Sequence, residues 1–219
     1  MLTRRVAVAA RPGRRPGSLR TAILRAARRL HAAHGADGVT ARALARAVGV
    51  SPTAIYLHFR GIDDVLEQLR MEGHERLATY LRGAGGATAT ERIRAMGRAY
   101  FRFGVEQPEY FDLMFHGRPG AARRRDAVHR EMFTLLILRD AVVAGIAAGE
   151  LRDDVDPMVV TNALWAEVHG VTALRAAGLL VETSDGHADE VLDAVLDGAL
   201  RWIAPQNRAR PNAGRRRQT

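Results

Sequence analysis

The segment that most constrains the fold is residues 40–59, TARALARAVGVSPTAIYLHF. Its small, turn-forming and apolar residues stand where two short helices joined by a tight turn need them. Ala45 allows the two helices to touch, Gly49 tolerates positive φ in the turn, and Ile55 places a branched apolar side chain under the second helix. This spacing is typical of a helix-turn-helix.

Charge divides the 219-residue chain into two parts. Residues 1–62 contain twelve Arg and one acidic residue, residues 63–207 contain sixteen Arg and twenty-three acidic residues, and the last twelve residues add five Arg. A basic segment joined to a slightly acidic body is the charge distribution expected of a protein that binds a polyanion through one end. We therefore expect two domains.

Composition excludes several other classes of protein. The chain has no cysteine, which rules out disulfides and thiol chemistry. It has no apolar run near 18 residues, and residues 1–17 lack the apolar core of a signal peptide. We expect a cytoplasmic protein with no membrane contact.

The N-terminal domain is predicted over residues 18–62 as three helices. Ser18 is expected to cap the first helix and Thr40 the second, which Gly49 ends in the left-handed conformation. Ser51 is expected to cap the third helix, with Pro52 at its first position, where a missing N–H is tolerated.

Residues 63–204 are predicted to form a helical body. Apolar spacing and breakers place its helices at about 63–82, 90–107, 108–116, 121–149, 157–178 and 188–204. No segment alternates with period two, so we expect no sheet and an all-α fold of about nine helices.

Both ends of the chain are predicted to be disordered and basic. Residues 1–17 hold five Arg and no acid, and residues 205–219 are similarly rich in Arg. The N-terminal arm is either a solvated tail or a segment that lies along a DNA backbone.

Two motifs connect this pattern to a known family. The third helix ends in Tyr56-Leu57-His58-Phe59, and residues 165–170 read WAEVHG. With a three-helix head and a long helical body, the chain resembles the TetR family of bacterial transcriptional regulators. The Trp165, His169 and Gly170 pattern is similar to the C-terminal domain class named for its Trp-His-Gly motif.

The resemblance and the helix-turn-helix geometry together predict the residues that contact DNA. The third helix is expected in the major groove, which admits one helix and displays a distinct pattern for each base pair. Side chains expected at bases are Thr53, Ala54 and Leu57, and those expected at phosphates are Thr40, Arg42, Ser51, Tyr56 and His58. Tyr56 and His58 alternatively close the head against the fourth helix, and Ile55 and Phe59 are expected in the core.

One position departs from the family pattern. Members often carry Lys three residues after the Phe of the motif, where this chain has Ile62. Arg60 is expected to supply the positive charge instead.

A homodimer is expected, because one short recognition helix cannot hold a long operator. The last helix carries two apolar rows, and the helix before it is apolar on a broad face. Val191, Val195 and Trp202 form one row and Leu192, Leu196 and Ile203 the other, and one row is expected to face the body and the other a partner. The same is expected of Leu164, Val168, Val171 and Leu174 in the preceding helix, so a four-helix interface is predicted from two helices of each chain. A last helix buried wholly within its own subunit is the alternative.

The body also carries many aromatic and thioether side chains, which form adaptable pocket walls. A pocket for a small apolar or amphipathic effector is predicted from Tyr100, Phe103, Tyr110, Phe111, Met114, Phe115, Met132, Phe133, Trp165 and His169. The alternative is that these side chains are ordinary core and that His169 is a hydrogen-bonded structural residue.

Metal and catalytic chemistry are not predicted. His31 and His34, like the cluster of Glu72, His74 and Glu75, lack a third ligand at the spacing of a zinc site and are expected to face solvent. We therefore expect no enzyme and no cofactor.

The sequence thus predicts a ligand-responsive regulator, most often a repressor in this family, that binds a palindromic DNA operator as a homodimer. The helix at 63–82 is expected to couple effector binding to the spacing of the two recognition helices. A constitutive DNA-binding protein without a ligand is the alternative.

Overall fold

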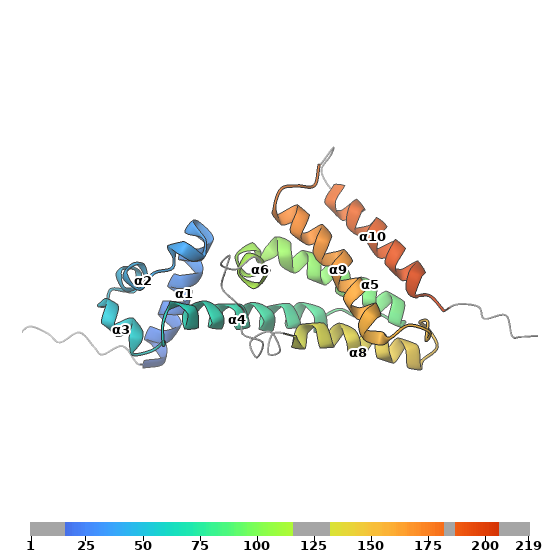
Figure 1. Cartoon of the computed structure of the whole chain (residues 1–219), viewed down its shortest axis with the longest axis horizontal. Helices are drawn as coiled ribbons and strands as arrows, with labels where there is room; N and C mark the ends of the chain where they lie inside the picture. Colours follow the sequence, from blue (N-terminus) through green and yellow to red (C-terminus); the bar gives the residue numbers. More distant parts are fainter. Residues whose placement is uncertain (1–15, 116–131, 182–186, 206–219) are drawn as a thin grey trace, which may run out of the picture.

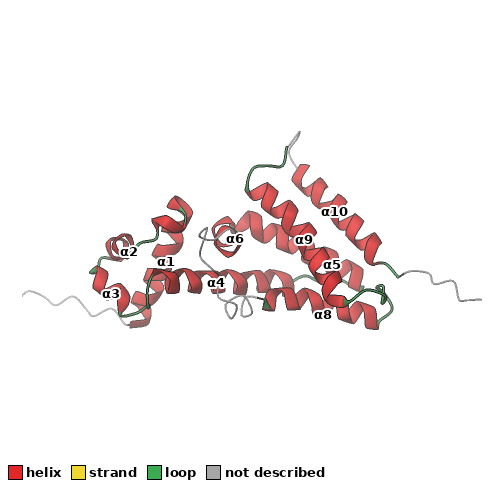
Figure 2. Ribbon diagram, in the orientation of Figure 1, coloured by secondary structure: helices red, strands yellow, loops and turns green. Residues whose placement is uncertain are grey.

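The computed structural model describes residues 16–115, 132–181 and 187–205, and these ranges contain helices and loops but no strand (Figure 2). The elements are α1 (Pro16–His34), the short 3₁₀ helix η1 (Ala36–Gly38), α2 (Ala41–Val48), α3 (Pro52–Tyr56), α4 (Ile62–Arg82), α5 (Ala89–Glu106), α6 (Pro108–Phe115), α8 (Phe133–Ala147), α9 (Pro157–Ala176) and α10 (His187–Ile203). The predicted all-helical class is confirmed.

Parts of the prediction fall outside the described residues. The predicted arm and tail do so apart from residues 16, 17 and 205, and the predicted helix at 121–149 is described only from residue 132. Among the described helices, none combines the length and apolar character needed to cross a membrane.

Local signals explain the three helices of the head. The Thr40 hydroxyl accepts a hydrogen bond from the N–H of Ala43 (3.1 Å), and Gly49 ends α2 with a φ of 72°. The expected cap at Ser18 is wrong, because α1 begins at Pro16 and Ser18 lies inside it. Ser51 is the N-cap residue of α3 as expected, but its side chain makes no capping hydrogen bond. Pro52 at the start of α3 fixes that end instead.

The helix α4 runs from the head into the body (Figure 1). Its first half contributes Val65, Leu66 and Leu69 to the core of the head, and its second half contributes Leu77 and Leu81 to the core of the body. Because α4 is uninterrupted, one continuous helix contributes side chains to both cores.

The body packs α5 against α4, α8, α9 and α10. Two glycines of α5 allow this close packing: a Cβ at Gly97 would lie 2.6 Å from Leu196 of α10, and a Cβ at Gly104 would lie 2.3 Å from Thr172 of α9. The outer helices α9 and α10 lie side by side on α5 (Figure 1).

Candidate functional site

The second and third helices form a helix-turn-helix. The turn begins at Gly49, and the N–H of Val50 donates to the carbonyl of Ala45 (3.0 Å), which closes the end of α2. On the inner side of α3, Ile55 is fully buried and Phe59 nearly so, which confirms both as core residues. The opposite side of α3 therefore faces outward.

The nine predicted DNA-contacting residues lie on or near this outward side. Tyr56 is 56% exposed and Leu57 is 79% exposed, which is unusual for side chains of their size. Thr40, Arg42, Ser51, Thr53 and Arg60 are exposed, whereas Ala54 and His58 are half-buried. Exposed apolar and aromatic groups on a short helix need a partner surface to cover them.

Ile62, which stands where the family often has Lys, is the first residue of α4. Its side chain is half-buried and packs against the core of the head, so it contributes to packing. Nearby, the backbone N–H of Arg60 donates to the Asp64 carboxylate (2.9 Å). The side chain of Arg60 is exposed.

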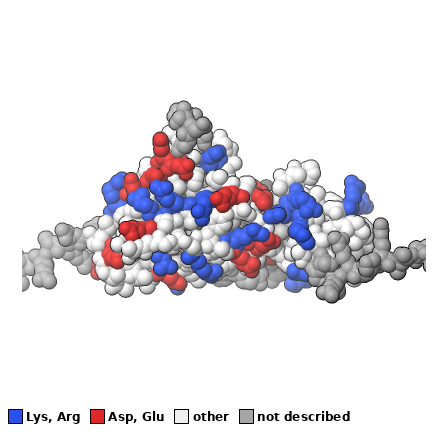
Figure 3. Space-filling view, turned by 180° about the vertical axis from the view of Figure 1, so that it is seen from behind, with Lys and Arg blue, Asp and Glu red and all other residues white. Residues whose placement is uncertain are grey.

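Sequence reasoning missed two basic side chains on α1. Arg25 and Arg29 are exposed one turn apart and line a shallow hollow with Ala47 and Val48 of α2. Seen from behind, basic side chains stand without acidic neighbours over the head, whereas both signs mix over the body (Figure 3). Helical spacing of Arg opposite an apolar face is the signal that identifies these two residues.

A second connection between head and body runs through α1 and α6. Arg28 lies 3.7 Å from Glu109, and Nε2 of His31 lies 3.4 Å from the Asp112 carboxylate. Leu113, also on α6, is buried in the core of the head. The expectation that His31 faces solvent is wrong, because α6 covers it.

The electrostatics of His31 follow from this burial. Loss of solvent lowers the pKa of His31 below its ordinary value, although the carboxylates of Asp112 and Glu109 act in the opposite direction. The neutral imidazole is therefore favoured at this joint.

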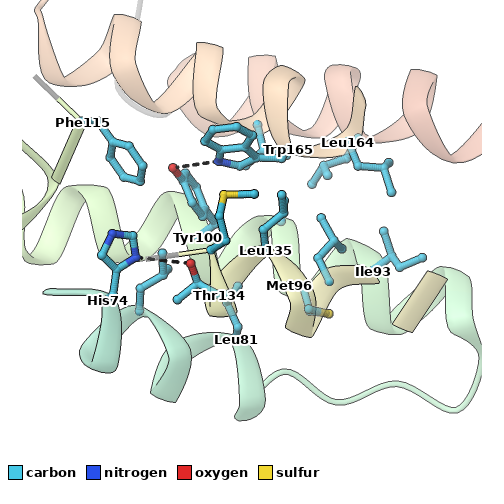
Figure 4. Close-up of a pocket in the computed structure, with 16 residues that line it drawn as sticks. His74, Leu81, Ile93, Met96, Tyr100, Phe115, Thr134, Leu135, Leu164 and Trp165 are labelled. Carbon is cyan, nitrogen blue, oxygen red and sulfur yellow. Dashed lines mark hydrogen bonds between the residues drawn. The ribbon is translucent and has the colours of Figure 1, made fainter. Parts of the chain in front are cut away.

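The body contains an apolar cavity of about 170 Å³ between α4, α5, α8, α9 and α10, with α6 at one end (Figure 4). Its lining consists of His74, Leu77, Leu81, Ile93, Met96, Gly97, Tyr100, Phe115, Met132, Thr134, Leu135, Leu138, Leu164, Trp165, Val168 and Leu196. An engineered cavity of similar size, about 150 Å³, binds benzene.

Four of the ten predicted pocket residues line this cavity: Tyr100, Phe115, Met132 and Trp165. Phe103, Tyr110, Phe111, Met114, Phe133 and His169 do not, because they pack elsewhere in the same aromatic region. Phe103 packs against Tyr80, for example, and Tyr110 lies beneath the guanidinium of Arg76. Because α6 is buried on most sides, spacing alone does not identify the side that faces the cavity.

His74 is the functional candidate that sequence reasoning placed wrongly. It was expected to face solvent, but it is 5% exposed and lines the cavity. Its Nδ1 lies 3.3 Å from the hydroxyl of Thr134 on α8, sixty residues away in the chain. Only the fold brings these two polar groups together.

The Trp165 and His169 side chains anchor α9 to α5. The indole N–H of Trp165 donates to the Tyr100 hydroxyl (3.4 Å), which lies 2.9 Å from Nδ1 of His169. Since an indole nitrogen can only donate, the hydroxyl accepts from Trp165, and the direction of its bond with His169 follows the tautomer of the imidazole. Burial raises the pKa of Tyr100 well above its usual value, so its hydroxyl keeps its proton.

The outward surfaces of α9 and α10 differ from the predicted interface. Leu164, Val168, Val171, Leu192, Leu196 and Ile203 are buried within their own chain, because they face α5 and the body core. Of the other predicted residues, Val191 and Val195 are half-buried, and Leu174 and Trp202 are exposed.

Two glycines lie within these helices without an explanation inside the chain. A Cβ at Gly170 of α9 would meet no atom within 4 Å, and one at Gly198 of α10 would approach only the tip of Arg201, at 4.0 Å. Glycine inside a helix costs about 1 kcal/mol relative to Ala.

No catalytic or metal chemistry is evident in the described residues. In residues 16–115, 132–181 and 187–205, no three His, Cys, Asp or Glu side chains are grouped so that they could hold a metal ion. The polar groups of the cavity are hydrogen-bonded into its wall.

Comparisons with known proteins agree with this geometry. Residues 23–69 match the profile of bacterial regulatory proteins of the tetR family, and residues 93–199 match the Tetracyclin repressor-like C-terminal domain. The HTH-type transcriptional repressor AcnR of Corynebacterium glutamicum is 30% identical over 196 residues, which cover 86% of this chain and 96% of that repressor.

Solved structures show the same fold. A protein of unknown function from Rhodococcus sp. RHA1 has a TM-score of 0.75 at 30% identity and covers 89% of this chain and 100% of its own. The regulator FadR of Bacillus subtilis, in complex with stearoyl-CoA, has a TM-score of 0.66 at 18% identity and covers 81% of this chain and 98% of its own. The chain therefore belongs to the TetR family of DNA-binding transcriptional regulators, which are not enzymes.

Proposed function

We propose that this regulator is a ligand-responsive repressor. It binds a palindromic operator in the cytoplasm as a homodimer and leaves the operator when a small molecule enters the cavity of the body. The observation that carries the proposal is the continuity of α4, which contributes Leu69 to the core of the head and His74 to the cavity wall five residues later.

The proposed DNA contacts follow from exposure on the head. Thr53, Ala54 and Leu57 of α3 meet base edges, and Tyr56 and His58 meet phosphates. The other contacts from sequence, all exposed, are at phosphates: Thr40, Arg42, Ser51 and Arg60. The free rotation of the Ser51 hydroxyl, which caps nothing, supports a role at a phosphate.

The basic face of α1 extends this surface. Arg25 and Arg29 add two exposed positive charges beside α2. Each phosphate neutralised by such a group releases counterions from DNA, so operator affinity depends steeply on salt.

The proposed dimer interface is the outward surface of α9 and α10. On α10 it comprises Val191, Val195, Gly198 and Trp202, which recur at helical spacing. On α9 it includes Gly170 and Leu174. Two helices from each chain then form a four-helix interface, and the two glycines permit a close approach between chains.

We further propose that the body is of the Trp-His-Gly type. Trp165 and His169 would then serve to hold α9 on α5 through Tyr100, which is supported by their shared hydrogen bonds. Gly170 would serve on the opposite side of α9, at the partner chain.

Coupling between cavity and DNA is proposed to run through α4 together with α6. Phe115 of α6 lines the cavity, and Leu113 of the same helix lies in the core of the head. Ligand would favour one tilt of this pair of helices, and DNA the other.

The test starts with the selection of protein-bound fragments from genomic DNA. The proposal expects a palindrome whose half-sites are one helical turn apart, about 34–36 Å, or a multiple of it. On that operator, the log–log slope of affinity against salt should be about one unit per phosphate contacted. A slope near zero or a single asymmetric half-site contradicts the proposal, and operator binding that no small molecule relieves favours the constitutive alternative.

A further inference from the structure

The cavity of the body has two chemically different ends (Figure 4). At one end, His74, Thr134, Tyr100 and Trp165 bring polar atoms to the wall, and Phe115 stands beside them. At the other end the wall is aliphatic, with Ile93, Met96 and Leu164 among its side chains. A molecule that fits both ends is amphipathic.

The polar end contains two hydrogen-bonded groups, one around Tyr100 and one formed by His74 and Thr134. The Tyr100 hydroxyl accepts from Trp165 and is hydrogen-bonded to His169, so it holds two residues of the wall together. His74 and Thr134 form the second pair, at 3.3 Å. A threonine hydroxyl and an imidazole ring both hydrogen-bond to uncharged oxygen groups, so this pair suits such a group of a ligand.

The charge of the ligand follows from the lining. Among the described residues, no Arg, Lys, Asp or Glu lines the cavity. The ring contacts of His74 include Phe115 and Phe133, which are neutral. A cationic ligand group would lose its hydration here without a carboxylate to replace it, and an anionic group would require the His74 imidazole to take up a proton.

We propose that the cavity takes a neutral, mainly apolar molecule with one hydrogen-bonding group, such as a small phenol or alcohol, and that His74 and Thr134 hold this group. This inference rests on the proposed function, because it names the class of the effector. His74 lies five residues after Leu69, about 7.5 Å along α4 at the rise of a helix, so the ligand acts directly on the helix that carries the head.

The test compares three probes of similar shape by calorimetry at pH 7.5: para-ethylphenol, ethylbenzene and para-ethylbenzoate. We expect para-ethylphenol to bind about 2- to 10-fold more tightly than ethylbenzene, through its hydrogen bond. We expect para-ethylbenzoate to bind at least about 30-fold more weakly than para-ethylphenol, because its carboxylate loses its hydration in a described lining that contains no Arg or Lys.

Three variants test whether the hydroxyl of Thr134 binds the hydroxyl of the phenol. Thr134→Val removes the hydroxyl at nearly constant shape and should weaken para-ethylphenol about 2- to 10-fold while ethylbenzene changes less than about 2-fold. Thr134→Ser keeps the hydroxyl and should retain the affinity. Thr161→Val is the matched control, because Thr161 is buried and bonded to the carbonyl of Pro157 outside the lining.

The inference is overturned if none of the probes binds, if the carboxylate binds as tightly as the phenol, or if Thr134→Val weakens both neutral probes equally. Operator release is measured separately by fluorescence anisotropy. Probes that bind in the expected order without releasing the operator leave this inference standing and contradict the proposed repressor switch.

Discussion

Gly170 provides a test in which one substitution has opposite effects on the single chain and on the dimer. A Cβ at Gly170 would meet no atom of the chain within 4 Å, so we expect a side chain there to fit without strain. Leu is a far better helix former than Gly, and Gly170→Leu should therefore stabilise the isolated chain by about 0.8 kcal/mol. For a chain of this size, that corresponds to a rise in Tm of about 2–3 °C.

The same side chain should break the dimer. Packed helices approach to about 8–10 Å between axes, and excess volume at such a contact costs about 1–3 kcal/mol. In a two-fold interface the substitution occurs twice, so the dimerisation free energy should lose about 2–6 kcal/mol. This loss corresponds to a dimer Kd about 30- to 20,000-fold larger.

Sedimentation equilibrium over a range of concentrations measures the dimer Kd, and thermal unfolding at concentrations below Kd measures the single chain. Ala144→Leu is the control, since Ala144 is exposed on α8, which is not part of the proposed interface. A dimer Kd that stays within about 3-fold of the parent in Gly170→Leu would refute the proposed interface. An unfolded variant would refute the reasoning that the site is open.

Three further predictions concern the head, the joint and the body. Tyr56→Ala should weaken operator binding by about 1–3 kcal/mol, or about 5- to 150-fold, and should leave Tm unchanged because the side chain is 56% exposed. Fluorescence anisotropy on the selected operator measures the affinity. Unchanged affinity would mean that another face of α3 contacts DNA. Burial lowers the pKa of His31, so the unfolded chain binds more protons near pH 6 than the folded chain, and the free energy of unfolding should fall as pH drops below about 6.5. Chemical denaturation should show a flatter pH profile for His31→Gln. Identical profiles for the two proteins would contradict the lowered pKa of His31. Gly104→Ala should destabilise the fold by about 1–3 kcal/mol in urea unfolding, because the new Cβ would lie 2.3 Å from the side chain of Thr172. The Thr172 hydroxyl donates to the carbonyl of Val168, which holds that side chain in place. A more stable variant would show that α5 and α9 adjust freely.

The head could be predicted from sequence because its determinants are local. Gly49 and Pro52 set the turn and the start of α3 within a few residues, and the apolar spacing of Ile55 and Phe59 identifies the inner side. Ser51 takes the expected N-cap position, and the proline that follows it fixes the helix start without a bond from the serine side chain. Arg25 and Arg29 lie on the outer face of α1, outside the motif, so the motif does not identify them.

The cavity and the interface depend on contacts that no local pattern contains. His74 and Thr134 meet across sixty residues, and α4 alone gives no sign that one of its polar side chains turns inward. On α9, apolar residues occupy nearly every side, so periodicity does not separate Leu164, which faces the body, from Leu174, which faces outward. The glycines carried the clearer signal, because a mid-helix glycine needs a neighbour that comes close.

The geometry of α4 sets the size of the movement that a ligand must produce. Fifteen residues separate Leu77 at the cavity from Ile62 at the head, about 22 Å along the helix. A tilt of about 5° about the cavity end therefore displaces the head by about 2 Å, and the two-fold axis of the proposed dimer would double the change in spacing between recognition helices. The ion pair of Arg28 with Glu109 and the contact of His31 with Asp112 tie the head to α6 as well, so α6 must move with α4 or these contacts must break. Because Phe115 places α6 at the same end of the cavity as His74, one small molecule there reaches both helices that hold the head.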